Sequence, residues 1–525
     1  MKKYYLILAI NFCLFCYGYS DISVSHSGYT NLYAINRISN GSVIKLPFRL
    51  LSYDLNIDYM NFSFKTKWGL EHKVKSFDVS QPFHNLMYDL ISPDNVDYTS
   101  VFREFYLSYF PSFGEIKIGK QIHAWGATDI SSPIDILNPI DYYYLFTDVD
   151  ETKIGRNSFV MDLYFDPIKI ELLIMPNHIA NNIPNNDPDF PITLPANVQD
   201  YQFLDTDNPI EYGGYFQYSM DNMDWSAYYF SGYDRNFNLY GSNAFFNATN
   251  TVTVTDTILS YRKTQMYAFS NVSFLEDLTL RADVAYFKTD AGNQSIENRL
   301  YSGKNVFTEA GVEFPEYFAS KYFNISGQYY QYSLQLEYLL PFDIDFSSQI
   351  FGYEKIKVEG DVIDVSLTNF EYYLDGKDFF YPGMGSSMAT IAKNGWLINF
   401  NKTILDDTME FQFSNLLDTK DKGNLFQFKW TYNIIDNCSL SFLYYKGTGN
   451  YKKYPDITFV DSNNDGINDD LLNNETGTVT TDFNLDGLPD GDGILDADMI
   501  DDSMLYPFNP MEQFSHIRIQ LQYFF

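Results

Sequence analysis

Apolar and polar side chains alternate with a period of two in many segments of about ten residues. In the last ten residues, HIRIQLQYFF, the odd-numbered positions from Ile517 to Phe525 are apolar, and the polar residues His516, Arg518, Gln520 and Gln522 alternate with them. Residues 278–286, 332–338 and 426–432 repeat the pattern. Side chains of an extended strand point alternately to its two faces, so each segment predicts a strand with one apolar and one polar face. Eighteen such segments can be identified, with sixteen as the alternative count.

The connections between these segments fall into two classes. Very short turns follow the even-numbered strands, and long polar connections follow the odd-numbered ones, so that the two classes are expected never to mix. The short turns are expected at residues 55–58, 111–114, 166–167, 221–222, 276–277, 341–342, 406–407 and 436–437. The long connections are expected at about 74–101, 123–156, 178–208, 232–257, 289–321, 358–392 and 447–513.

This asymmetry indicates an all-β fold, a closed antiparallel transmembrane β-barrel with short periplasmic turns and long extracellular loops. In lipid the closing strand must pair with the first strand, residues 22–34, because an open edge would leave backbone groups unpaired. The chain resembles outer-membrane β-barrels, whose last strand typically ends in an aromatic residue. That resemblance implies that Phe525 is read by the barrel assembly machinery. A soluble cell-surface β protein is the alternative.

The two ends and the composition support the same location. Residues 1–20, with Met1-Lys2-Lys3 before an apolar run, predict a cleaved secretory signal, and residues 21–525 then form the barrel. No later apolar run approaches the roughly 20 residues of a membrane helix. Tyr and Phe number 45 and 46, which suits strands and interfacial girdles. We therefore expect the outer membrane of a Gram-negative-type bacterium, with lipid as a partner, no nucleic acid, and oligomer formation left open.

The polar faces predict a hydrated lumen that carries both signs of charge. Basic positions are Lys65, Lys67, Lys117, Arg281, Lys429 and Arg518, and acidic ones are Glu71, Asp283, Glu337 and Glu410. A barrel of sixteen to eighteen strands can leave an aqueous channel. The six His are scattered and neither G-x-S-x-G nor H-E-x-x-H is present, so no enzyme is expected. The pattern predicts passive or weakly selective passage of small hydrophilic solutes.

The most distinctive motif begins at the end of the fifth predicted strand. It reads GKQIHAWGATD from residue 119 and continues with LNPID from residue 137. It resembles a porin-like outer-membrane family with the pattern G-[KR]-Q-x3-W-G-x2-D followed by L-N-P-x-D, and the resemblance implies a transport role. The loop 123–156 is expected to constrict the lumen, although it could simply brace itself against the wall. The candidate constriction residues are Lys117, Lys120, Gln121, His123, Trp125, Asp129, Asp135, Asn138 and Asp141. By parity Lys120 faces lipid, unless a bulge at Gly119 moves it.

The connection 456–502 contains 14 acidic residues and no Lys or Arg. Its repeated D-x-N-x-D-G text places oxygen ligands at alternate positions, with a glycine that permits a sharp turn, as in calcium loops. It resembles the calcium-binding aspartate loops of thrombospondin type 3 and dockerin-like modules, and the plain alternative is a solvated acidic loop. Candidate Ca²⁺ ligands are Asp461, Asn463, Asp465, Asp469, Asp482, Asn484, Asp486, Asp490, Asp492 and Asp496. A rival function follows, a surface-binding or structural barrel with a calcium-stabilised loop and a plugged lumen.

Overall fold

The polar and apolar alternation produces one 18-stranded antiparallel sheet. The computed structural model describes residues 22–44, 47–74, 96–144, 152–183, 203–204, 206, 209–246, 252–291, 317–364, 373–388, 392–420, 423–448, 457–460, 470–473, 478–480 and 515–525. The barrel strands are β1 (Ile22–Arg37), β2 (Phe48–Tyr59), β3 (Phe62–Val74), β4 (Val96–Tyr109), β5 (Gly114–Gln121), β6 (Arg156–Phe165), β7 (Ile168–Met175), β8 (Glu211–Met220), β9 (Met223–Tyr233), β12 (Lys263–Leu275), β13 (Leu278–Asp290), β15 (Ser326–Leu340), β16 (Ile344–Glu359), β19 (Asn394–Ile404), β20 (Met409–Asp418), β21 (Asn424–Ile435), β22 (Cys438–Thr448) and β26 (His516–Phe524).

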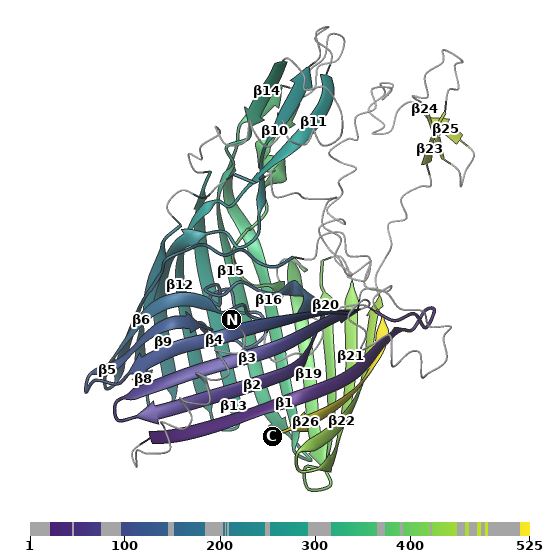
Figure 1. Ribbon diagram of the computed structural model, residues 1–525. Helices are drawn as coiled ribbons and strands as arrows, with labels where there is room; N and C mark the ends of the chain where they lie inside the picture. The colour runs from purple at the N-terminus through teal and green to yellow at the C-terminus, as the bar shows by residue number, and fades with distance from the viewer. Residues whose placement is uncertain are drawn as a thin grey trace, which may run out of the picture.

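The sheet closes on itself through its first and last strands. β26 pairs with β1 from Tyr29 opposite Phe524 to Arg37 opposite His516, and on its other side it pairs with β22. Each barrel strand pairs with its neighbours in chain order, and Figure 1 shows the resulting closed wall. The predicted closed barrel of eighteen strands is confirmed, because closure gives every strand two neighbours and leaves no unpaired edge.

The outer surface of this wall is apolar. On β7, Leu172 and Ile174 are about half exposed while Leu173 and Met175 between and beside them are buried in the interior. Aromatic side chains gather near the short turns, as in the girdles of membrane barrels. They include Tyr59, Phe62, Tyr109, Phe110, Phe113, Phe165, Tyr218, Tyr338, Phe342, Tyr523 and Phe525. In the described ranges, helical segments are too short and too polar to cross a membrane.

The predicted short turns are confirmed at seven of their eight positions, and the prediction at 55–58 is wrong. There β2 continues to Tyr59, and the turn is at Met60 and Asn61. Asn56 and Asp58 face one another within the strand, since the Asn56 amide donates to the Asp58 carboxylate at 2.8 Å. Polar residues that line a hydrated lumen are of the same types as turn residues, which explains the misplacement.

The external connections are less uniform than expected. Most are long, but residues 419–423 join β20 to β21 in a connection as short as a periplasmic turn. The expectation that the two classes never mix is therefore wrong at this position. The first and last barrel strands begin and end beside short turns, since Ile22 pairs with Tyr59 and Cys438 pairs with Tyr523. The start of the first barrel strand and the end of the last one therefore both lie on the periplasmic side.

Smaller sheets are built from the external connections. β10 (Asn238–Phe246), β11 (Val252–Ser260) and β14 (Tyr317–Tyr322) form a three-stranded sheet that rises beyond the barrel rim (Figure 1). β17 (Val362–Asp364) pairs with β18 (Tyr373–Asp375), which leads into the 3-10 helix η3 (Gly376–Phe379). β23 (Ile457–Val460), β24 (Asp470–Asn473) and β25 (Thr478–Thr480) form another sheet within the acidic connection. The predicted signal, residues 1–20, lies outside the described residues.

Candidate functional site

The inner wall of the barrel is polar and carries paired charges. Lys117 lies 3.2 Å from Asp162 and 3.1 Å from Glu115. A second pair joins Lys65 of β3 to Glu104 of β4 at 3.6 Å. These contacts connect neighbouring strands along the side of the lumen formed by β3 to β6, and the ionic groups are held on the inner face by the strand alternation.

The connection between β5 and β6 spans residues 122–155, and its described parts, 122–144 and 152–155, fold into the barrel; we call these parts the inner loop. Ile134, Ile136 and Leu137 of this loop are almost completely buried. They belong to one apolar cluster with inward side chains of six strands, namely Val160, Leu173, Met175, Phe230, Met266, Ala285, Phe287 and Tyr329. The loop also contains the 3-10 helix η1 (Tyr142–Tyr144), whose Tyr142 packs in a second cluster with Leu397 and Leu416 on the opposite wall. The inner loop therefore spans the lumen from wall to wall.

Asp283 of β13 is the main polar anchor of the inner loop. It is fully buried, and its carboxylate accepts hydrogen bonds from four donors. These are the backbone nitrogens of Ala127 and Thr128 and the hydroxyls of Thr128 and Ser132, at 2.7 to 3.0 Å. Charge-assisted bonds of this kind are stronger than neutral ones. The alternation of the sequence places Asp283 in the lumen. The alternation does not indicate which residues Asp283 contacts, because they lie about 150 positions earlier in the inner loop.

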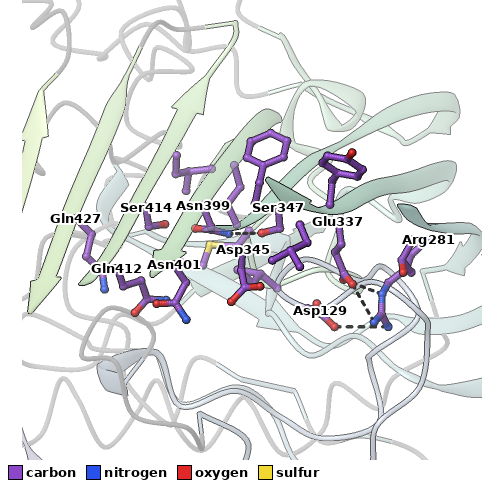
Figure 2. A pocket seen from close by; sticks show the side chains of 18 of the residues that line it. Asp129, Arg281, Glu337, Asp345, Ser347, Asn399, Asn401, Gln412, Ser414 and Gln427 are labelled. Carbon is purple, nitrogen blue, oxygen red and sulfur yellow. Dashed lines mark hydrogen bonds and ion pairs between the residues drawn. The ribbon is translucent and has the colours of Figure 1, made fainter. Parts of the chain in front are cut away.

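A second contact joins the tip of the inner loop to β15. The backbone nitrogen of Asp129 donates to Gln335 Oε1 at 2.9 Å, and Gln335 Nε2 donates to Asp129 Oδ2 at 2.6 Å. Arg281 lies 2.9 Å from Glu337 and 3.9 Å from Asp129. Figure 2 shows Asp129, Arg281 and Glu337 side by side at the edge of a cavity, so the loop tip forms part of a charged lining.

Asn138, of the L-N-P-x-D part of the motif, ties the start and end of the inner loop together. Its Oδ1 accepts from the backbone nitrogen of His123 at 2.6 Å, and its Nδ2 donates to the carbonyls of Gln121 at 3.2 Å and Ile154 at 2.8 Å. Gln121 and His123 both contact the Ser158 hydroxyl, at 2.9 and 3.0 Å. These bonds close the base of the loop against β6.

The structure explains the adjacent Trp125 and Gly126 of the motif. The indole of Trp125 is buried, and its Nε1 donates to the Glu171 carboxylate at 2.7 Å. Gly126 adopts a φ of +93°, which L side chains rarely adopt, and an added Cβ there would lie 2.1 Å from Ser132 Oγ and 2.9 Å from Asp283 Oδ2. The glycine therefore lets the backbone pass close to Asp283, where the anchoring bonds form.

Burial shifts the pKa of several groups in the inner loop. Desolvation, followed by the nearby charge of Lys117, lowers the pKa of His123 to about 4, so its ring is neutral at pH 7. Burial raises the pKa of Asp141 to about 6, although the backbone N–H of Tyr143 donates to its carboxylate. Burial also raises the pKa of Asp135, against the opposing effect of its ion pair with Lys153. A neutral His123 suits its buried contact with Ser158.

The structure brings eight of the nine candidate constriction residues to the interior and separates Lys120 from them. Lys117 and Gln121 are on the inner face of β5, and the other six lie in the inner loop. The β5–β6 register runs through Gly119 without a shift, since Gly119 faces Ser158 and Lys120 faces Asn157. Without a bulge, alternation places Lys120 on the outer side with Ile118, which is 58% exposed.

Beside the inner loop, toward the short turns, the lumen contains a cavity of about 660 Å³, which we call the vestibule. Its lining includes Asp129 of the loop and inward residues of β13, β15, β16, β19, β20 and β21 (Figure 2). A second cavity of about 270 Å³ is lined by β1, β2, β20, β21, β22 and β26. Both are lined largely by amide, hydroxyl and charged side chains.

Metal binding has no support within the described part of the chain, where no group of three or more His, Cys, Asp or Glu side chains is placed to hold an ion. The ten predicted Ca²⁺ ligands lie outside the described residues. They remain a prediction from the sequence.

No family model matches the chain, and no curated protein matches it. Among solved structures, it is similar to OmpT (in-vitro folded, trimer form), an outer membrane protein of Vibrio cholerae, with 10% identity, 96% of this chain and 100% of that chain covered, and a TM-score of 0.35. Pseudomonas aeruginosa OccK8 (OprE) has 7% identity, coverage of 96% and 98%, and a TM-score of 0.42. Acinetobacter baumannii OccAB3 has 9% identity, coverage of 97% and 100%, and a TM-score of 0.41. At these TM-scores the likenesses say nothing about function.

The location follows from the barrel itself. An even number of antiparallel strands, closure without an edge, an apolar outer surface with aromatic residues near the turns, and short turns at one end are together the features of outer-membrane barrels. The protein is therefore a β-barrel of the outer membrane.

Proposed function

We propose that this barrel is a channel for small hydrophilic solutes, with the inner loop as its constriction. The observation that carries the proposal is the vestibule of about 660 Å³, a polar cavity directly against a loop that Asp283 holds inside the lumen. Passage through such a barrel depends on pore width and on the polar groups that line it. The inner wall as a whole carries both signs of charge, as in the Lys117–Asp162 and Lys65–Glu104 pairs, which favours weak selectivity between ions, although the vestibule itself has an excess of carboxylates. No part of this role requires catalysis, and we propose that the protein is not an enzyme.

Conductance of the purified barrel in planar bilayers tests the proposal. The full chain should give steady ohmic steps, and replacing residues 125–144 by a short glycine-serine linker should enlarge them, since this removes the segment that spans the lumen. A matched control deletes residues 242–257 in the β10–β11 hairpin beyond the rim and should leave the step size unchanged. A heat-modified shift on gels shows that each variant is folded.

The rival function is a surface-binding or structural barrel with a plugged lumen, and one observation favours it. The inner loop is packed into apolar clusters on both walls, with Ile134 and Leu137 fully buried, as in a plug. In that case the full chain is electrically silent. Silence of both the full chain and the loop-replaced variant would reject the channel and leave the binding barrel.

A further inference from the structure

We propose that the vestibule contains a binding site for an uncharged, polyhydroxylated solute of the saccharide class, formed by β16, β19, β20 and β21. This inference deepens the proposed channel function and names the solute that the polar wall recognises. Its basis is the distribution of side chains within the cavity, in which the neutral amides and hydroxyls of β19, β20 and β21 occupy one side and most carboxylates the other, with Asp345 of β16 at the boundary (Figure 2).

The neutral side is organised in layers by the strand register. Asn399 of β19 pairs with Ser347 of β16 and with Ser414 of β20, and Ser414 pairs with Gln427 of β21. One neutral polar layer therefore crosses four neighbouring strands. Cross-strand partners on one face lie about 5 Å apart, a spacing that lets adjacent side chains contact successive hydroxyl groups of one solute.

A second layer lies two residues further along the strands, where Asn401 pairs with Gln412 of β20 on one side and with Asp345 of β16 on the other. The Oδ1 atom of Asn401 is buried and has no hydrogen-bond partner among the described residues, and both side chains line the vestibule. A buried acceptor without a partner costs free energy, which a hydroxyl donor from a solute offsets. Amide side chains offer both donors and acceptors, as hydroxyl groups do, so the match does not require a charge.

On the other side of the first layer the wall becomes apolar. Leu397, Leu416 and Leu425 pair across β19, β20 and β21 and also line the vestibule. These leucines are almost completely buried in a cluster with Tyr142 of the inner loop, so a solute bound here meets the strip of amides and hydroxyls and only the edge of the leucine strip. Sugar rings have the same division, with hydroxyl groups around the ring and apolar C–H faces. A small ion has no apolar surface that could pack against the leucine side chains.

The opposite side disfavours anions. It carries Asp129, Asp277 and Glu337, with Arg281 as the one cation among the described lining residues, while Asp345 lies at the boundary, opposite Asn401. Arg281 is already paired with Glu337 at 2.9 Å. The excess of carboxylates repels a negatively charged solute, whereas the amide layers can form hydrogen bonds with an uncharged solute. The vestibule should therefore bind sucrose better than gluconate.

Binding is measured on the folded full-length barrel in detergent micelles, by titration of ligand NMR line broadening with sucrose, potassium gluconate and glucosamine as probes. Sucrose should give saturable broadening and gluconate little. Asn399→Leu and Gln427→Met each keep the side-chain volume but remove hydrogen-bonding groups, and each should weaken sucrose binding by up to about tenfold. The control Ser348→Ala lies on the outer face of β16, where Ser348 contacts Trp396, and should bind as the parent does.

Three results would overturn the site: no saturable sucrose binding, equal binding of gluconate, or sucrose binding unchanged in both amide variants. If glucosamine bound more tightly than sucrose and its binding survived both substitutions, recognition would belong to the acidic side. That result would also reject the proposed saccharide site. Because binding is measured without transport, its outcome is separate from conductance. A silent barrel that binds sucrose rejects the channel alone, and a conducting barrel that binds no sucrose rejects the site alone.

Discussion

The Oδ2 atom of Asp283 lies 2.9 Å from the backbone nitrogen and 2.7 Å from Oγ1 of Thr128, although 155 positions separate the two residues in the sequence. One carboxylate on the barrel wall therefore fixes the backbone and the side chain of the inner loop together. Because the carboxylate is fully buried, movement of the loop away from the wall would break its hydrogen bonds and expose it. This contact makes the position of the inner loop testable with a single substitution.

Asp283→Ala should release the inner loop while leaving the barrel closed. Hydrogen bonds to a charged group contribute about 1.5 to 3 kcal/mol each, and those of one group are not additive, so we expect a loss of roughly 3 kcal/mol or more in loop docking. Conductance should rise and proteolysis within 122–144 should become faster. Glu359→Ala, an exposed carboxylate at the outer end of β16 that does not line the vestibule, is the control and should change neither. An Asp283→Ala barrel with parental conductance and protease resistance would contradict the anchoring role.

The fold could be predicted from the sequence because the membrane imposes a strict pattern. Outward positions must be apolar and inward ones polar, so parity alone gave the strands, the closing pair and the lumen side of residues such as Lys117 and Arg281. The error at residues 55–58 came from the same physics, because Asn56 and Asp58 satisfy each other inside the strand rather than forming a turn.

The interior of the site could be predicted only in part. The W-G and L-N-P-x-D motifs indicated a compact loop, but not that Asn138 joins Gln121 to Ile154, or that Gln335 holds Asp129. These contacts link positions far apart in the chain, and a single sequence contains no periodic signal for them. Lys120 was a candidate constriction residue, but it keeps the lipid-side parity of Ile118 because no bulge forms between β5 and β6 to turn it inward.

Two buried groups of the inner loop should give the barrel opposing responses to acid. Burial lowers the pKa of His123 from 6.5 to about 4, so its contribution to stability is complete above pH 6.5 and is lost as the pH falls toward 4, by on the order of 3 kcal/mol. Burial raises the pKa of Asp141 from 3.8 to about 6, so its folded form gains stability as the pH falls through the same window.

Single substitutions should separate the two responses. His123→Gln should make the urea midpoint less sensitive to acid than that of the parent between pH 6.5 and 4, and Asp141→Asn should make it more sensitive. Unfolding in detergent micelles, followed by fluorescence at several pH values, measures both. Shifts of both variants in the same direction would show that these pKa changes do not control the acid response.

We propose that the acidic connection binds Ca²⁺ through its D-x-N-x-D-G repeats. Fourteen acids without a basic residue repel one another, and bound ions would neutralise that repulsion. Extracellular modules of this kind bind in the range of about 10⁻⁴ to 10⁻³ M, and Mg²⁺ should substitute poorly because of its rigid octahedral shell. Isothermal titration of the barrel should show saturable Ca²⁺ binding that Asp465→Ala and Asp486→Ala together abolish. Binding that persists in the double variant, or none below about 10 mM, supports a plain acidic loop.

The last residue should matter more for assembly than for stability. Phe525 exchanges two backbone hydrogen bonds with Gly28, both 3.0 Å; the residue is 43% exposed, and its ring lies on the outer face beside Tyr53. A half-exposed ring buries little area, so Phe525→Ala should lower stability by only about 1 kcal/mol. If the assembly machinery reads this ring, as we propose, the same variant should accumulate far less folded barrel in cells.

Phe524→Ala is the matched control, because Phe524 has a similar exposure of 42% and packs edge-on against Tyr29 at 6.3 Å. It should lose a comparable amount of stability in refolded protein yet assemble normally in cells. The measurements are the heat-modified folded fraction in outer membranes and the urea midpoint after refolding in detergent. Because both rings lie on the same strand end, an equal assembly defect in the two variants would mean that stability of the closing strand, and not recognition of the terminal residue, limits assembly.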